Sequence, residues 1–131
     1  MSTPLYVVIP GQPVPASRPR VARRGTYTER RYKQWKADAS VLIRDAAVKQ
    51  LGAVPEWPGD VYIYAEFHGA HGASDLDNLL KGVLDATQLS GVIVNDKQVK
   101  HLEALMYALP RKDKANARTE ITINVMRDRG G

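Results

Sequence analysis

Apolar residues recur along the chain with two different spacings, and this change of spacing limits the fold more than any other feature. From Tyr32 to Ala46 and from Leu76 to Leu84 they lie three and four residues apart, which is the period of one buried face of an α-helix. In segment 60–68 apolar and polar residues alternate, which is the period of a half-buried strand. A chain that combines both periods within 131 residues is expected to form one α+β domain.

Shorter signals complete the expected order of elements. Strands are expected at 5–9, 60–68, 91–94, 99–108 and 118–126, and helices at 29–51, after an N-cap at Thr28, and at 75–89. Asn95 and Asp96 form a turn-prone pair, and residues 110–117 are expected to form a polar loop. We therefore predict that residues 1–131 form a single domain, in which a mixed sheet of about five strands packs against two helices.

The composition excludes several classes of protein. The absence of cysteine excludes disulfide frameworks, thiolate metal sites and thiol nucleophiles. The longest uncharged apolar run, from Ala104 to Leu109, is far shorter than the roughly 20 residues of a membrane span. The N-terminal apolar stretch has no basic residues before it and is broken by Pro10 and Gly11, so no secretory signal is expected. We expect a soluble, cytoplasmic protein that does not bind membranes.

Positive charge is concentrated in one segment. Residues 18–36 contain eight basic residues and one acidic residue, a net charge of +7, which leaves −2 for the rest of a chain whose net charge is +5. Prolines and glycines prevent regular structure in the first part of this segment, so residues 11–28 are expected to form a long basic loop. Concentrated positive charge suits a polyanion such as DNA, although a solvated charged surface is the alternative. The expected DNA-binding residues are Arg18, Arg20, Arg23, Arg24, Arg30, Arg31 and Lys33.

Two other groups of residues have both a structural and a functional interpretation. Tyr32 and Trp35 fall on the apolar stripe of the first helix, so a place in the core is favoured over a platform for stacking bases. His68 and His71 have no further nitrogen or sulfur ligands near them in the sequence, so a histidine-rich metal site is not favoured.

Acidic residues gather around the second helix. Asp75 and Asp77 lie where a loop passes into that helix, and both carboxylates can point the same way if Asp75 precedes the first full turn. The expected strand 91–94 can then run back beside the helix and carry Asp96 to its start. The alternative is that the aspartates only stabilise the helix N-terminus and pair with Lys81 one turn later.

Three carboxylates within about 5 Å of one another would repel by roughly 3 kcal/mol per pair at an effective dielectric near 20. Lys81 alone could not offset that repulsion, but a divalent cation could, and oxygen ligands favour Mg²⁺ or Mn²⁺. Such a cation beside a basic surface is typical of a phosphodiester hydrolase. Lys81 would stabilise the negative charge that develops on the phosphate or orient the attacking water.

The segment DLDNLLKGVLDATQLSGVIVNDKQV, residues 75–99, resembles the signature of the RusA family of Holliday junction resolvases. That signature is a DxDNxxKxxxDA helix followed by an Asp-Asp-like turn and a Gln-Val pair. The opening GQPVPASRPR, residues 11–20, resembles family members more loosely. Together these two parts cover about half of the chain.

The resemblance implies a small α+β fold with a mixed sheet, with Asp75, Asp77 and Asp96 as metal-binding carboxylates and Lys81 as the catalytic lysine. It also implies a homodimer that uses Mg²⁺ or Mn²⁺ to cut four-way DNA junctions symmetrically during recombination and repair. The chain departs from the family at Asn95, where an aspartate is common, and metal affinity would be weaker if that position contributes a ligand.

Two alternatives to a junction resolvase stay open. One is a metal-dependent nuclease with a different DNA substrate, because one fold can serve many substrates. The other is a non-catalytic basic DNA-binding protein whose aspartates only stabilise a helix.

Overall fold

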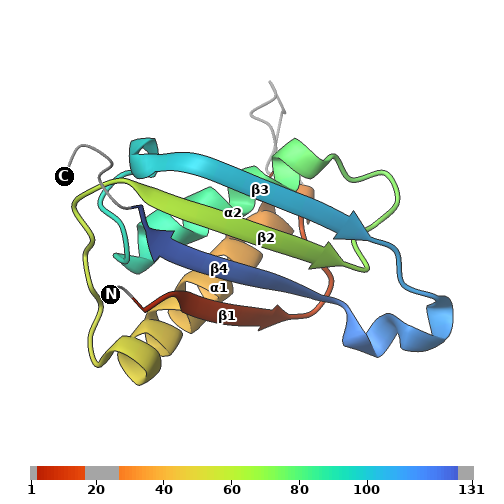
Figure 1. Cartoon of the computed structure of the whole chain (residues 1–131). Coiled ribbons are helices and arrows are strands. Elements are labelled where there is room, and N and C mark those ends of the chain that lie inside the picture. The colour runs from red at the N-terminus through yellow and green to blue at the C-terminus, as the bar shows by residue number, and fades with distance from the viewer. Residues whose placement is uncertain (1–2, 17–26, 127–131) are drawn as a thin grey trace.

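A computed structural model of the chain describes residues 3–16 and 27–126. Four strands form one mixed sheet, and two long helices lie against one of its faces (Figure 1). The elements are β1 (Leu5–Pro10), α1 (Tyr27–Leu51), β2 (Val61–His68), α2 (Leu76–Ser90), the short 3₁₀ helix η1 (Asp96–Gln98), β3 (Val99–Tyr107), the 3₁₀ helix η2 (Arg111–Asn116) and β4 (Arg118–Val125). The predicted α+β class is confirmed, with four strands rather than five.

The sheet has the strand order β1-β4-β2-β3, so β1 and β3 are its edge strands. β4 is antiparallel to both of its neighbours, whereas β2 and β3 are parallel. Parallel neighbours require a crossover, and α2 provides it between β2 and β3. The direction of α2 is therefore opposite to that of β2, from the end of the sheet where β2 finishes to the end where β3 begins.

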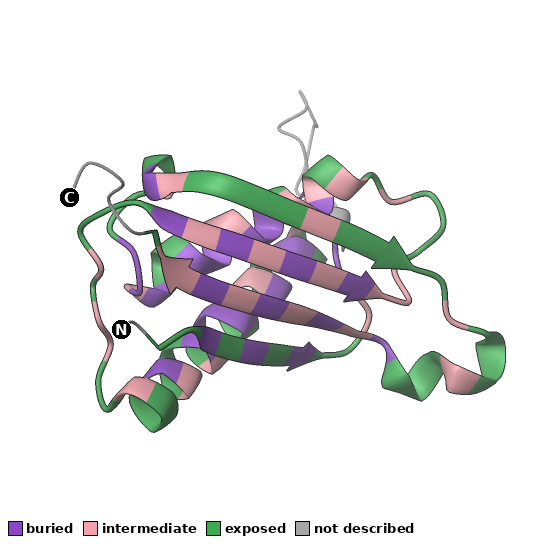
Figure 2. Ribbon diagram, viewed as in Figure 1, coloured by how far each residue is buried: buried purple, intermediate pink, exposed green. Residues whose placement is uncertain are grey.

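Alternation along the strands divides the sheet into a buried and an open face (Figure 2). Val61, Ile63, Ala65 and Phe67 of β2 are fully buried, as their alternation predicts. Side chains of the intervening residues lie on the face that the helices leave open. The sheet therefore has one apolar face packed against the helices and one face open to solvent.

The apolar stripe of α1 packs into the core as predicted. Tyr32 and Trp35 are only 7% and 8% exposed, so they belong to the core and do not form a platform for bases. Gly52 ends the helix with a positive φ of 87°. The helix begins at Tyr27, so the prediction of Thr28 as the N-cap is wrong. In the described part of the chain, no helix is both long enough and apolar enough to cross a bilayer.

The predicted strand 91–94 is wrong. Gly91 adopts a left-handed conformation, φ 86°, and ends α2, after which Val92 and Ile93 are buried beneath the segment around Trp57. The Trp57 N–H donates to the Val92 carbonyl over 2.9 Å, and Ile93 forms only an isolated bridge with Trp57. A four-residue apolar run thus fills the core in the link to β3 without pairing as a strand of the sheet.

Candidate active site

Asp75 and Asp77 occupy the start of α2. Asp75 is the N-cap residue with extended backbone angles, φ −89° and ψ 138°, so it precedes the first turn, which is the condition for both carboxylates to point the same way. Its side chain makes no capping hydrogen bond, and the Asp77 carboxylate accepts one hydrogen bond, from the Asn78 N–H at 3.0 Å. Both residues are exposed. Their oxygens are therefore open to a ligand. Both charges also lie at the N-terminus of α2, where carboxylates stabilise a helix without a capping hydrogen bond.

Lys81 pairs with Asp85 rather than with Asp77. Its Nζ lies 3.6 Å from Asp85 Oδ1, and the Tyr32 hydroxyl donates to the other carboxylate oxygen. Burial, followed by the hydrogen bond and negative charge of Asp85, raises the pKa of Tyr32, so the hydroxyl keeps its proton and remains a donor. Tyr32 of α1 thus fixes the Asp85 carboxylate, which in turn pairs with the exposed Lys81 ammonium.

Asp96 lies near the opposite end of α2. It opens η1, and its N–H donates to the side-chain oxygen of Gln88 over 2.9 Å. Gln88 follows Asp75 by 13 residues, which corresponds to about 20 Å along a helix axis. Because the predicted strand 91–94 does not form, nothing carries Asp96 back to the start of α2 within one chain.

The departure from the family signature, Asn95, has a structural role. Its side chain accepts a hydrogen bond from the Lys97 N–H at 2.9 Å, and the Gln98 side chain reaches back to the Asn95 backbone. This reciprocal arrangement is a capping box. The Asn95 side chain therefore caps η1 and fixes the turn that presents Asp96.

The predicted DNA-binding residues fall into two groups. Arg18, Arg20, Arg23 and Arg24 lie outside the described residues. Arg30, Arg31 and Lys33 are exposed on the first turns of α1, where Arg31 donates to the Gln12 side chain over 3.4 Å.

Two contacts link residues directly before and within the basic segment 18–36 to the acidic motif. Ala16, the last described residue before that segment, donates its N–H to the Asn78 carbonyl over 2.9 Å. At Gly82 the two helices approach closely, because an added Cβ would lie 3.2 Å from the Trp35 ring and 3.4 Å from the Tyr32 ring. The glycine of the motif therefore lets α1 hold its basic first turns beside α2.

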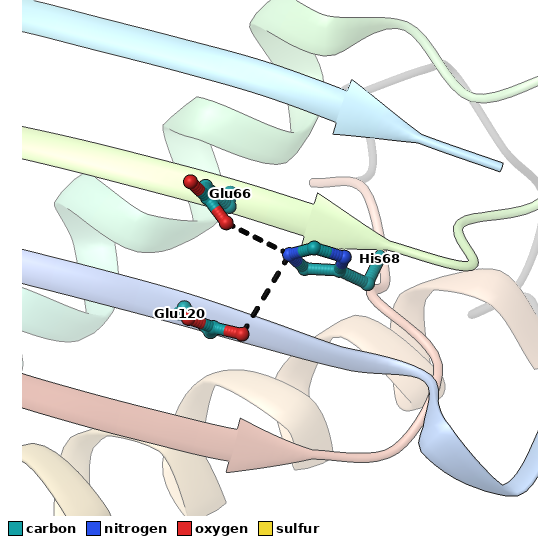
Figure 3. A group of neighbouring side chains, drawn as sticks. All are labelled: Glu66, His68 and Glu120. Atoms are coloured by element: carbon teal, nitrogen blue, oxygen red, sulfur yellow. Dashed lines mark hydrogen bonds and ion pairs between the residues drawn. The ribbon is translucent and has the colours of Figure 1, made fainter. Parts of the chain in front are cut away.

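Sequence reasoning missed a second cluster, on the open face of the sheet (Figure 3). His68 Nε2 lies 2.9 Å from Glu66 Oε1 and 3.6 Å from Glu120 Oε2. In the described ranges this is the one group of three acidic or histidine side chains close enough to share a metal ion. Glu66 and His68 alternate on one strand and could be paired from the sequence. Glu120 joins them only through the register of β2 with β4.

Hydrogen bonds lower the pKa of both glutamates in this cluster. The Tyr64 hydroxyl, and then His68, hold the pKa of Glu66 below its usual value. The Tyr6 hydroxyl, and then Arg118, do the same for Glu120. Donors to the ionised form favour that form, so both side chains remain charged at neutral pH.

Comparison with known proteins identifies the family. The family model described as endodeoxyribonuclease RusA matches residues 10–124, which is most of the chain and includes Asp75, Asp77, Lys81 and Asp96. A comparison with curated proteins gives no match. The matched range runs from the end of β1 almost to the end of β4, so it covers both long helices and the strands β2 and β3 in full. The chain belongs to the RusA endodeoxyribonuclease family.

Proposed function

We propose that this protein is a Mg²⁺-dependent homodimeric nuclease that resolves four-way DNA junctions by paired, symmetrical cuts during recombination and repair. The observation that carries the proposal is the hydrogen bond from Ala16 to Asn78, because it places Ala16, two residues before the first arginine of the basic segment, beside the motif that carries the exposed aspartates of α2. DNA phosphates held by that segment would lie next to the carboxylates. Family membership supports the nuclease activity.

The chemistry of the donors fits a hard cation. Asp75 and Asp77 offer exposed carboxylate oxygens and no nitrogen or sulfur ligand, which suits Mg²⁺ or Mn²⁺. When bound, the ion would activate water and neutralise charge on the scissile phosphate. Lys81, held one turn further along α2 by Asp85, would stabilise the charge that develops on the phosphate oxygens.

Asp96 can complete this site only from a second copy of the chain. Asp96 opens η1, which directly precedes β3. β3 is an edge strand whose far end lies beside the end of β2, where the chain turns into α2. If two β3 edges pair across a two-fold axis, the strands run antiparallel. Each Asp96 then comes to the end of the sheet where the other copy carries Asp75 and Asp77. The dimer would thus assemble two identical sites.

The side chains of β3 support this interface. Apolar side chains on the strand are between 39% and 47% exposed, namely Leu102, Leu105, Met106 and Tyr107. A long edge strand with exposed apolar side chains is a template for pairing with another chain. In Figure 1 the first turns of α2 project past this edge, close to where a pairing strand would lie.

Mixed dimers test the shared site. Asp77→Asn and Asp96→Asn chains are each expected to be inactive alone. If Asp96 acts in the other copy, a dimer of one chain of each kind keeps one site with all its carboxylates, so nicking of a four-way junction returns. If each site lies within one chain, every site in the mixture lacks a carboxylate. Absence of nicking in a verified mixed dimer would therefore refute the shared site.

A substrate assay separates the alternatives. Cutting of a four-way junction is compared with cutting of a linear duplex of the same sequence, with and without Mg²⁺. Preference for the junction supports the resolvase, whereas equal rates would identify a nuclease with another substrate. Junction binding without any Mg²⁺-dependent cutting would identify a non-catalytic DNA-binding protein.

A further inference from the structure

The cluster on the open face of the sheet brings two negative charges together. Glu66 and Glu120 are direct partners across the antiparallel pair β2 and β4, and like charges in that relation destabilise a sheet. Their side chains are only 23% and 21% exposed, so water screens them incompletely. His68, two residues along β2 on the same face, places Nε2 between them (Figure 3).

The surrounding side chains fix which oxygens face the histidine. The Tyr64 hydroxyl donates to Glu66 Oε2, and the Tyr6 hydroxyl donates to Glu120 Oε1 over 2.8 Å. Glu66 Oε1 and Glu120 Oε2 are therefore the atoms turned toward His68. Groups that bind the outer oxygens of metal-binding carboxylates in this way orient the ligands and raise metal affinity.

Two further contacts restrict the site. Arg118 Nε donates to Glu120 Oε2 over 2.6 Å, which leaves that oxygen one lone pair. The His68 ring stacks on the Tyr107 ring, with centroids 4.7 Å apart and planes at 14°. Arg118 balances part of the negative charge without separating the two carboxylates, and Tyr107 limits how far the imidazole can turn.

We propose that Glu66, His68 and Glu120 bind a divalent transition-metal ion, with Zn²⁺ as the best fit. Ligand atoms about 2.0–2.2 Å from a tetrahedral Zn²⁺ lie roughly 3.3–3.6 Å from one another. The two separations from His68 Nε2 are 2.9 and 3.6 Å, and all three ligand atoms lie within 4.8 Å of one another. Small side-chain movements therefore complete the geometry.

The ligand set also selects the ion. One imidazole with two carboxylates suits Zn²⁺ better than Mg²⁺, which prefers oxygen ligands and water. His68 binds through Nε2 as the neutral ring, with its proton on Nδ1. Three protein ligands leave the fourth position for water. Because the ligands come from two strands, the ion would link β2 to β4 on the face of the sheet that the helices leave open.

The test is a titration of the metal-free protein with Zn²⁺. Calorimetry measures the stoichiometry and affinity, and thermal unfolding measures the change in melting temperature. All variants carry Asp77→Asn, so that binding at the proposed catalytic site does not contribute. We expect about one Zn²⁺ per chain, with a rise of several degrees in Tm, because the ion binds the folded state alone. Co²⁺ in place of Zn²⁺ should give the visible absorption of a tetrahedral site.

Matched variants decide the assignment. His68→Gln and Glu66→Gln should each lose at least tenfold in Zn²⁺ affinity and the Co²⁺ absorption, with unchanged circular dichroism in the metal-free form. His101→Gln is the control, because His101 also lies 2.8 Å from a glutamate, Glu103, but the described residues offer that pair no third ligand. Absence of Zn²⁺ binding in the parent, or equal affinity in the His68→Gln variant, would overturn the proposal.

Discussion

Two groups of carboxylates in this protein have opposite surroundings. At the start of α2, Asp75 and Asp77 are exposed, and Asp75 makes no capping hydrogen bond. On the open face of the sheet, Glu66 and Glu120 are partly buried, and each accepts a hydrogen bond from a tyrosine. The first pair keeps its oxygens available for a ligand that arrives with DNA. The second pair contributes to the folded structure even before any ion binds.

Rates of junction cutting in matched variants should distinguish the two groups of carboxylates most clearly. Replacing residues that only support metal ligands costs about 10–100-fold in affinity or activity. Asp77→Asn removes a proposed direct ligand, so it should cost more than about 100-fold in junction cutting. Junction binding should persist. The matched variant Glu66→Gln should cut within about twofold of the parent. Loss of cutting in Glu66→Gln alone would mean that the roles of the two groups are reversed.

The basic segment should influence DNA affinity rather than the cutting step. Replacing Arg18, Arg20, Arg23 and Arg24 by glutamine should weaken junction binding more than tenfold at moderate salt. The slope of log affinity against log salt should fall by about 0.9 for each DNA phosphate that the variant no longer neutralises. Fluorescence anisotropy over a range of salt concentrations measures both quantities. An unchanged slope would show that this segment does not face the DNA.

The close contact between α1 and α2 at Gly82 should make the stability of the protein sensitive to a larger side chain at that position. Gly82→Val would press its side chain against the rings of Trp35 and Tyr32, which are buried and cannot move away. Overpacking of this kind costs about 1–3 kcal/mol, measured by urea unfolding. Gly59→Val is the control, because an added Cβ there meets no atom within 4 Å. Equal stabilities of the two variants would contradict the close approach of α1 and α2.

The sequence predicts the features that depend on residues close to one another in the chain, such as helices. The period of three and four residues located α2 to within one residue at each end. Sequence reasoning failed for segment 91–94, because a short buried run looks the same whether it pairs as a strand or only covers the core. The expected approach of Asp96 to the start of α2 in the same chain depended on that segment, so it is not found either.

The Glu66, His68 and Glu120 cluster shows the other limit of sequence reasoning. Glu66 and Glu120 are 54 positions apart, and only the register of two antiparallel strands makes them partners. A shift of one residue would place Glu120 on the opposite face of the sheet. The sequence of a single chain does not specify that register, so alternation could identify a polar face but not which of its residues meet.

The smallest expected effect is a pH dependence of stability that arises from the second group of carboxylates. In the folded protein the pKa of Glu120 is lowered, chiefly by the Tyr6 hydroxyl, so this interaction stabilises the protein above about pH 4.5 and is lost as the pH falls through the folded-state pKa. Tyr6→Phe should therefore lower the free energy of unfolding at pH 6, by less than about 1 kcal/mol because Tyr6 is 47% exposed. Near pH 3 the parent and the variant should converge. A difference that stays constant from pH 6 to pH 3 would show that the hydroxyl acts through packing, and that the charge of Glu120 does not distinguish this face from the start of α2.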